Sequence, residues 1–208
     1  MSDRLMMAVP RGALFTETLD LLERLGTDVS EVRSNDRKLL FAEPGIVTMR
    51  PSDVPTYVEH GSADIGITGK DVLLEQSERK VYELLDLGYG RCEMVVAAPS
   101  AGDAIGDALS RLGRVRIATK YPRVAAEHFA ATGRQAEIVE VKGSVELAPL
   151  TGLVDGIVDL TATGKTLAEN NLEVVERIAT STARLIANPV AHKLKAAEID
   201  AILERVRG

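Results

Sequence analysis

The feature of this sequence that most constrains its fold is the alternation of short apolar runs with segments of helical periodicity. Residues 5–9 form a continuous apolar run, which is typical of a strand buried on both faces. Phe15, Leu19 and Leu22 then recur at helical spacing, and Gly26 ends that pattern. Further strands are predicted at residues 46–49, 64–69, 94–98, 115–118, 137–141 and 156–160. Repeated strand-then-helix units predict an α/β protein with largely parallel sheets.

A cluster of turn-forming residues near the middle of the chain predicts two lobes. Pro99, Ser100, Gly102 and Gly106 lie close together in a chain of 208 residues. A ligand cleft between two lobes is a natural arrangement for a body of this size. We expect the first lobe to hold residues 1–95 and 180–208 and the second to hold residues 96–179.

Charge and cysteine content exclude several classes of function. The 25 Lys and Arg against 31 Asp and Glu give a net charge of −6, and no dense cationic run is present. Binding to a nucleic-acid backbone needs such a run, so we expect no nucleic-acid partner. Cys92 is the only cysteine, which excludes an internal disulfide and a multi-cysteine metal site. Without an export signal or ~20 consecutive apolar residues, we expect a cytoplasmic protein that does not bind membranes.

The strongest local motif runs over residues 155–167 (DGIVDLTATGKTL). A strand leads to Asp159, and a turn of small and hydroxyl residues then enters a helix. Unpaired N–H groups at a helix start suit a phosphate, and threonine hydroxyls add donors. Asp155 and Asp159 are four residues apart, so both lie on one face of the strand. Carboxylates beside a phosphate cradle suit ribose hydroxyls or a hydrated Mg²⁺, which indicates a sugar phosphate site.

Two other interpretations of this motif compete with a sugar phosphate site. Gly164, Lys165 and Thr166 end like a nucleotide-binding P-loop, but its first glycine would fall at Asp159, where the loop must turn tightly around phosphate. The other interpretation is helix capping by Thr161 or Thr163 with solvated aspartates. The motif alone leaves capping and ligand binding about equally supported.

Several other strand ends carry glycine, threonine or basic residues. Lys120 and Tyr121 stand between a strand and a helix that starts with proline, where a helix dipole attracts anions. Taken singly, each such cation is explained by a solvated surface turn. Repetition is the informative point, because parallel sheets bind ligands at the carboxyl ends of strands. The remaining candidates of this kind are Arg11, Arg37, Arg50, Gly69, Lys70 and Asp71.

Seven segments, taken in order, resemble the ATP phosphoribosyltransferase family over essentially the whole chain. They are residues 9–12 (VPRG), 50–58 (RPSDVPTYV), 64–71 (DIGITGKD), 85–92 (LDLGYGRC), 118–122 (ATKYP), 143–150 (GSVELAPL) and 155–167. The resemblance implies a bilobal fold like type II periplasmic binding proteins, with two mixed or parallel sheets flanked by helices and an active-site cleft between the lobes. It also implies transfer of the 5-phosphoribosyl group from 5-phosphoribosyl 1-pyrophosphate (PRPP) to N1 of ATP, the first step of histidine biosynthesis.

The resemblance also implies roles for individual residues. Arg37 and Arg11 would stabilise the leaving pyrophosphate, although Ala13 stands where the family often has a second arginine. Mg²⁺ would be held mainly through PRPP, near Asp155 and Asp159. The implied PRPP site comprises Asp155, Asp159, Thr161, Ala162, Thr163, Gly164, Lys165 and Thr166. Contacts to ATP or PRPP are implied for Arg50, Gly69, Lys70, Asp71, Lys120, Tyr121 and Glu146.

The end of the chain at Gly208 suggests the short form of this family. The resemblance then implies a homodimer that joins a separate regulatory subunit, similar to a histidyl-tRNA synthetase core, in a hetero-oligomer. The alternative from another class is a non-catalytic bilobal module that binds a small ligand. A P-loop nucleotidase is a third hypothesis, and it would hydrolyse ATP without PRPP.

Overall fold

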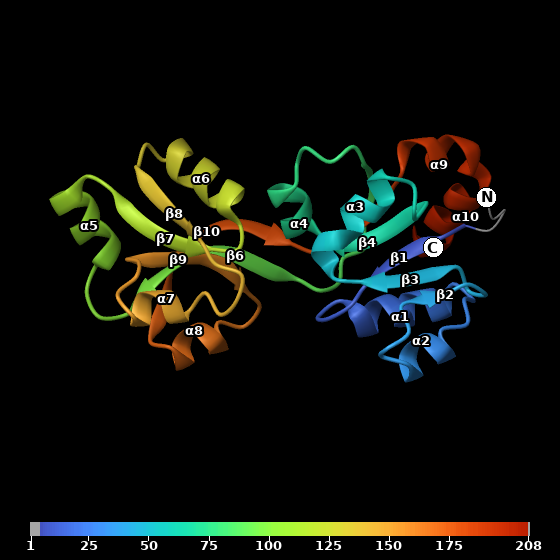
Figure 1. Ribbon diagram of the computed structural model, residues 1–208, viewed down its shortest axis with the longest axis horizontal. Coiled ribbons are helices and arrows are strands. Elements are labelled where there is room, and N and C mark those ends of the chain that lie inside the picture. The colour runs from blue at the N-terminus through green and yellow to red at the C-terminus, as the bar shows by residue number, and fades with distance from the viewer. Residues whose placement is uncertain (1–4, 208) are drawn as a thin grey trace. The chain divides into compact units, whose positions relative to one another are not determined.

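The computed structural model describes residues 5–207, and the chain divides into two compact units, each built on one β-sheet (Figure 1). Unit 1 comprises the described residues up to Gly90 and those from Thr182 onward, and unit 2 is Arg91–Ser181. The predicted boundaries after residues 95 and 179 fall inside the strands β6 (Cys92–Pro99) and β10 (Leu172–Ser181) of unit 2. In the part of the chain that is described, no helix is long and apolar enough to cross a membrane.

Unit 1 contains a six-stranded mixed sheet in the order β2-β3-β1-β4-β11-β5. Its strands are β1 (Met7–Pro10), β2 (Leu40–Phe41), β3 (Ile46–Met49), β4 (Ile65–Gly69), β5 (Tyr82–Asp86) and β11 (Ala183–Ala187). Its helices are α1 (Phe15–Arg24), α2 (Ser30–Ser34), η1 (Pro51–Asp53), α3 (Val54–Glu59), α4 (Lys70–Glu75), α9 (Pro189–Leu194) and α10 (Ala196–Arg207). The central strands β3, β1 and β4 run parallel, whereas β2 and β11 pair antiparallel with their neighbours.

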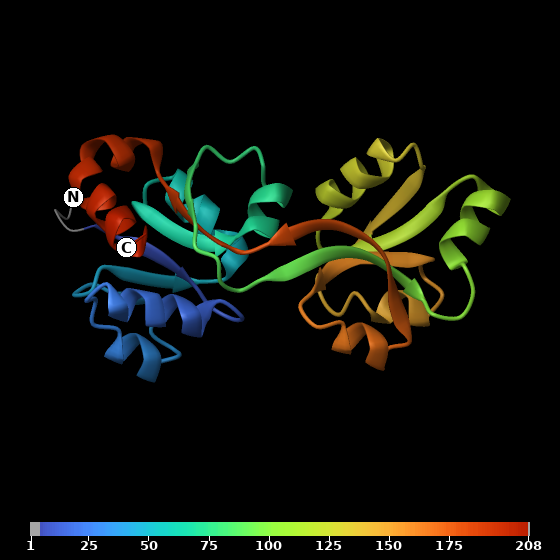
Figure 2. The same ribbon diagram turned by 180° about the vertical axis from the view of Figure 1, so that it is seen from behind.

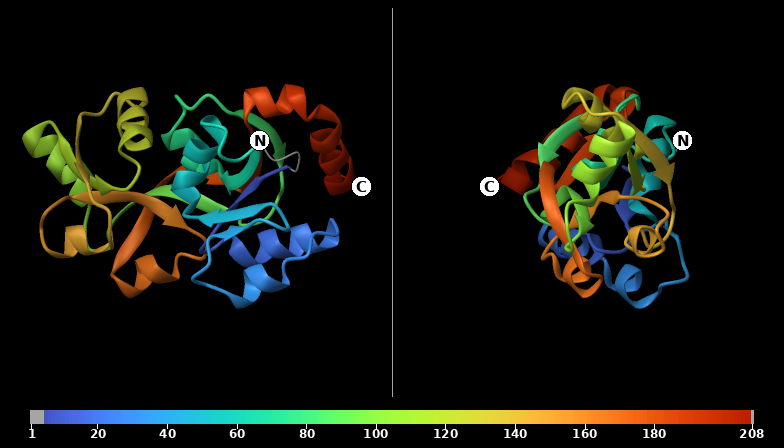
Figure 3. Two further views of the ribbon diagram at one scale, coloured as in Figure 1. Left: turned by 45° about the vertical axis from the view of Figure 1, so that its right-hand side comes forward. Right: turned by 90° about the vertical axis from the view of Figure 1, so that its left-hand side faces the viewer.

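Strand alternation divides the apolar residues of unit 1 between two faces. Val9 and Ile67 face a core shared with α1, α2 and α10, whereas Ala8 packs against α3 on the other face. Figures 1 and 3 show α1 and α3 on opposite sides of this sheet. A Cβ on Gly66 would lie 2.6 Å from Val54 Cγ1, so the missing side chain lets α3 pack closely on β4.

Unit 2 contains a five-stranded mixed sheet in the order β10-β6-β9-β7-β8. Besides β6 and β10 it comprises α5 (Ala104–Leu112), β7 (Val115–Thr119), α6 (Pro122–Ala131), β8 (Ala136–Glu140), α7 (Leu147–Leu150), β9 (Gly156–Thr161) and α8 (Lys165–Glu169). The neighbours β8, β7 and β9 run parallel, and β6 pairs antiparallel with β9 and β10. The long pairing of β6 with β10 can be followed in Figure 2.

The predicted α/β class is confirmed, and each predicted strand is present within a few residues of its expected bounds. The sheets are mixed because β2 and β11 run against the parallel strands of unit 1 and β6 runs against those of unit 2. Sequence pattern missed β10, whose Glu173, Glu176 and Arg177 break its apolar alternation. β10 is an edge strand that pairs only with β6 in the sheet order. An edge strand is less buried than a central one, so fewer of its residues need to be apolar.

Candidate functional site

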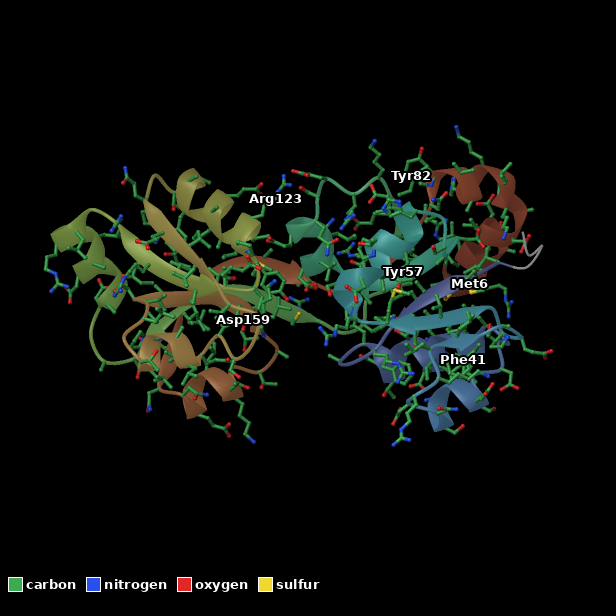
Figure 4. The ribbon with its side chains drawn as sticks, viewed as in Figure 1. Met6, Phe41, Tyr57, Tyr82, Arg123 and Asp159 are labelled. Carbon is green, nitrogen blue, oxygen red and sulfur yellow. The ribbon has the colours of Figure 1, made fainter. Side chains whose placement is uncertain are left out.

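The centre of unit 2 brings together Lys120 and Asp159, two residues that sequence analysis placed in separate motifs. The register of β7 and β9 pairs Thr119 with Val158, so the next residues of the two strands stand side by side. Lys120 Nζ lies 3.9 Å from Asp159 Oδ2. The Asp159 side chain lies at the carboxyl end of β9, where Figure 4 marks it. The structure thus joins the lysine turn and the 155–167 motif at one edge of the sheet.

At this edge, the connections that leave two neighbouring strands run towards opposite sides of the sheet. From β7 the chain enters α6 and continues to β8, whereas from β9 it enters α8 and continues to β10 on the opposite side of the sheet order. Figure 1 shows α6 and α8 on opposite faces of the sheet. Open α/β sheets bind ligands at such a switch point, in the crevice outside the carboxyl ends of the strands.

Asp159 is a buried carboxylate at this edge, with 8% of its surface exposed. One carboxylate oxygen accepts the backbone N–H of Leu160 at 2.8 Å, and the other faces Lys120. A carboxylate has two acceptor oxygens with about four lone-pair sites, which suits hydroxyl donors. Lys120 is more exposed than Asp159, so its ammonium can reach an anion in solvent.

The turn between β9 and α8 is ordered by its own threonines. Thr161 Oγ1 accepts the N–H of Gly164 at 2.9 Å, and Thr163 Oγ1 accepts the N–H of Lys165 at 3.4 Å. Gly164 has φ +75°, a left-handed conformation that glycine adopts at little cost. The capping interpretation therefore describes a real feature of this turn. Each accepting hydroxyl still keeps its own hydrogen, so capping and donation to an anion are compatible.

The remaining residues of this turn are exposed to solvent. Ala162 and Thr166 are exposed, and Lys165 Nζ lies 3.9 Å from Glu169 Oε1 on the same helix. An oxyanion at this turn would meet hydroxyls and an exposed ammonium.

Asp155 is not brought to this turn. It precedes β9, and its oxygens accept the N–H of Arg116 at 2.8 Å and its guanidinium at 3.2 Å. Asp159 is four residue steps further along the chain, a distance of about 13 Å along β9. The even spacing does put both aspartates on one face, but at opposite ends of the strand.

Tyr121 and Glu146 both stand at the start of helices in unit 2. The Tyr121 N–H donates to Thr119 Oγ1 at 2.8 Å, which shapes the turn that carries Lys120. Glu146 is half-buried and immediately precedes α7. Of these two, the structure connects Tyr121 directly with the Lys120 turn.

In unit 1 the structure brings Arg11 to the loop that carries Arg37. Arg11 follows β1, and its guanidinium donates to Thr48 Oγ1 and to the carbonyl of Lys38, each at 2.9 Å. Asn35 Oδ1 accepts the N–H groups of Arg37 and Lys38 and so shapes that loop. Arg11 is thereby fixed, whereas the exposed Arg37 guanidinium has no partner among the described residues.

The other candidates of unit 1 follow the neighbouring parallel strands. Arg50 follows β3 and is exposed, and Gly69 ends β4. Lys70 Nζ lies 2.6 Å from a carboxylate oxygen of Glu83, and Asp71 is buried at the start of α4. Because β3, β1 and β4 are parallel neighbours, these residues and Arg11 share one edge of the sheet.

Sequence reasoning missed Thr48, Lys38 and Arg116 as residues that hold the candidates in place. Thr48 and Arg116 are polar residues within otherwise apolar strands, and a buried polar group needs a partner. That signal was available, but the partners lie 37 and 39 residues away in sequence, so only the strand order identifies them.

Comparisons with known proteins agree on one family. A family model described as ATP phosphoribosyltransferase matches residues 50–208. The ATP phosphoribosyltransferase of Rubrobacter xylanophilus is 52% identical over 97% of this chain and 94% of its own length. ATP phosphoribosyltransferase 2 of Geobacter sulfurreducens is 47% identical over 98% and 97% of the two chains.

Two solved structures illustrate the similarity of this fold to known proteins. A chain of the ATP phosphoribosyl transferase (HisG:HisZ) complex from Thermotoga maritima matches with a TM-score of 0.82 and 36% identity, covering 98% of this chain and 97% of its own. The periplasmic aliphatic sulphonate binding protein SsuA from Escherichia coli matches with a TM-score of 0.62 and 13% identity, covering 99% and 72%, which shows a shared fold alone. The extent and identity of the other matches decide the family: this chain belongs to the ATP phosphoribosyltransferases.

Proposed function

We propose that this chain transfers the 5-phosphoribosyl group of PRPP to N1 of ATP, giving N1-(5-phosphoribosyl)-ATP and pyrophosphate in the first step of histidine biosynthesis. Membership of the family supports the reaction. The structural observation that carries the proposal is the Lys120–Asp159 pair beside a threonine-rich turn at the switch point of unit 2.

The unit 2 edge suits the ribose phosphate end of PRPP. Asp159 suits the ribose hydroxyls, because a carboxylate is an acceptor with two oxygens and this one lies at the carboxyl-end edge of the sheet beside Lys120. The hydroxyls of Thr161 and Thr163, with the ammonium of Lys165, suit the 5-phosphate. Lys120 adds a cation beside Asp159 at the same edge.

The reaction itself needs no nucleophilic side chain from the protein. Adenine N1 is already a neutral nucleophile, so no residue must remove a proton from it. The barrier lies in expelling pyrophosphate from a carbon that gains oxocarbenium character, and preorganised cations lower it. Arg37 and Arg11 are the residues proposed for this role, with Arg11 held in place by Thr48 and the Lys38 carbonyl.

The donor set also fits a metal ion that arrives with the substrate. Among the described residues, no group of three or more His, Cys, Asp or Glu side chains could hold a metal by itself. Mg²⁺ characteristically takes one or two carboxylates together with substrate phosphates. We therefore propose that Asp159, and not the Arg116-bound Asp155, is the carboxylate near Mg²⁺. When bound, the ion would neutralise charge on the pyrophosphate.

We further propose that the chain works in a hetero-oligomer with a separate regulatory subunit. The similar Thermotoga maritima chain comes from a HisG:HisZ complex, which supports this assembly. The homodimer, the likeness of the regulatory subunit to a histidyl-tRNA synthetase core and the cytoplasmic location stay predictions.

An assay with ATP, PRPP and Mg²⁺ tests the function directly. We expect pyrophosphate release that requires both substrates, and a reverse reaction when pyrophosphate is added to the product. A non-catalytic ligand-binding module would show neither activity, and a P-loop nucleotidase would hydrolyse ATP without PRPP.

Two variants test the unit 2 site. Asp159→Ala and Thr163→Val should each leave the fold intact and weaken PRPP binding, about 10- to 100-fold for the carboxylate because hydrogen bonds to charged groups are worth ~1.5–3 kcal/mol. Asp107→Ala, at an exposed position of α5, is the matched control for Asp159→Ala. Calorimetry that gave wild-type PRPP affinity for both site variants would refute this placement.

A further inference from the structure

Arg116 and Asp155 form a second cation–carboxylate pair on the same two strands that carry Lys120 and Asp159. Asp155 accepts both the backbone N–H and the guanidinium of Arg116, and its own N–H donates to the Arg116 carbonyl at 2.9 Å. The Asp155 carboxylate is 17% exposed and the Arg116 side chain 40% exposed. The proposed reaction uses neither residue.

The register of the strands relates the two pairs. Ile117 pairs with Gly156 and Thr119 with Val158, so Arg116 and Asp155 precede the paired stretch and Lys120 and Asp159 follow it. The register places Arg116 beside Asp155 and Lys120 beside Asp159, and residues four apart on a strand point the same way, so all four side chains lie on one face of the sheet. The Arg116–Asp155 pair marks the start of the shared stretch, and the Lys120–Asp159 pair marks its end.

The paired residues between the two pairs, 117–119 of β7 and 156–158 of β9, define the register of these strands only weakly. On β7 they are Ile117, Ala118 and Thr119, and on β9 they are Ile157 and Val158 after a glycine. A slip by one residue would exchange the faces, but a slip by two would keep every side chain on its face. Such a slip would move Lys120 about 7 Å along the strand relative to Asp159.

The pairing of β9 with β6 has a steric determinant of its own. A Cβ on Gly156 would meet the Ala97 carbonyl oxygen at 3.0 Å, so this close approach suits glycine. Against β7 the approach is less close, because a Cβ on Gly156 would meet only the flexible end of Ile117, at 3.3 Å. The Arg116–Asp155 pair adds a polar determinant of this register, because the Asp155 carboxylate accepts both the backbone N–H and the guanidinium of Arg116.

We infer that Arg116 and Asp155 are positioning residues, which set the register of β7 against β9 and so hold Lys120 at Asp159. This inference rests on the proposed function of the unit 2 edge as the PRPP site. It gives Asp155 a role different from the ribose contact implied by family resemblance, because both of its oxygens bind Arg116 and it lies at the opposite end of β9.

A double-mutant cycle in PRPP affinity, measured by calorimetry, tests the inference. Asp155→Ala and Arg116→Ala should each weaken PRPP binding by about 3- to 10-fold, and the double variant no further, because residues that act as a unit are not additive. Arg114→Ala is the matched control, since Arg114 pairs with Glu137 of β8 on the other side of β7 and should leave the affinity within twofold.

The other outcomes overturn the inference. Weakening by Asp155→Ala alone with unaltered contacts between β7 and β9 would mean that Asp155 touches the ligand, because its bond to the Arg116 backbone N–H survives in Arg116→Ala. Additive losses would mean independent contacts, and wild-type affinity in both single variants would mean no positioning role. If the alanine variants fail to fold, Asp155→Asn and Arg116→Lys replace them with the same expected pattern.

A register measurement separates this inference from the proposed function. Backbone nuclear Overhauser contacts between residues 117–119 and 156–158 should be altered in Asp155→Ala and unchanged in Arg114→Ala. If the wild-type chain bound no PRPP, the proposed function would fail while this measurement still decided the strand register. Unaltered contacts in Asp155→Ala would refute the positioning role.

Discussion

At the scale of single residues, the two arginines of unit 1 differ in how firmly the protein holds them. Arg11 donates to Thr48 and to the Lys38 carbonyl, and it lies 5.4 Å from the centre of the Phe15 ring. Arg37 is in the adjoining loop with an exposed guanidinium. Both guanidiniums can donate to charge that develops on a leaving group, which is the role proposed for them.

Arg37→Ala should therefore affect the transition state more than substrate binding. Removing one donor of this kind typically costs about 10²–10³ in kcat, so kcat should fall by more than the KM for PRPP rises. Steady-state kinetics of the variant measure this split, with Arg24→Ala, an exposed arginine of α1, as the matched control. An unchanged kcat in a folded Arg37→Ala protein whose chemical step limits the rate would exclude this role.

At the scale of elements, Tyr89 connects the segment after β5 with α1. Its hydroxyl lies 2.7 Å from Thr18 Oγ1, and the single hydrogen of Thr18 is donated to the Leu14 carbonyl at 2.6 Å. The Tyr89 O–H is therefore the donor to Thr18. Burial raises the pKa of Tyr89 to about 12, so the hydroxyl keeps its hydrogen at neutral pH.

Tyr89→Phe should lower the free energy of unfolding by about 0.5–1.5 kcal/mol, because the ring stays while the hydrogen bond is lost. Thermal or urea unfolding at pH 7 measures this loss. Tyr57→Phe is the matched control, since Tyr57 is an exposed tyrosine of the same unit. Equal stability of wild type and Tyr89→Phe would show that the buried bond is not stabilising.

The same tyrosine predicts a pH dependence at the alkaline end. A folded-state pKa of about 12 exceeds the ordinary value of 10.0, so the neutral phenol stabilises the fold fully below pH 10. That contribution declines as the pH rises from 10 towards 12. The stability difference between wild type and Tyr89→Phe should therefore shrink over that interval, and a constant difference would contradict the assigned pKa.

At the scale of the whole molecule, control by histidine should need a second polypeptide. Coupling between distinct sites requires a partner that binds two states of the catalytic chain unequally, typically by ~1–3 kcal/mol. We expect the purified chain to form a small homo-oligomer, measured by light scattering, on which histidine has no allosteric effect. Adding the synthetase-like subunit should raise activity and create histidine inhibition together.

Kinetics with and without that subunit decide the prediction. Lysine at the same concentration is the control for a nonspecific amino-acid effect. Histidine that inhibits the isolated chain noncompetitively with both substrates, at the concentrations effective in the complex, would place the regulatory site on this chain.

Sequence reasoning recovers what local physics dictates. Continuous apolar runs predicted the central strands, and the left-handed Gly164 with its two threonines was expected as a turn into a helix. The mixed sheets implied by the family resemblance are confirmed, whereas the edge strand β10 was missed because it lacks a strong apolar pattern. The even spacing of Asp155 and Asp159 correctly predicted a shared face but not their opposite ends.

The sequence by itself determined the alternation of strands and helices, the ordered motifs that mark the family, and the residue types at each strand end. Those properties depend on neighbours within a few positions of the chain. Only the tertiary structure decided that Lys120 faces Asp159, that the Arg116 guanidinium donates to Asp155, and that the Arg11 guanidinium donates to Thr48. These pairs join residues that are 37 to 39 positions apart in the sequence. Strand order and register bring them together, because backbone pairing between strands sets which side chains meet.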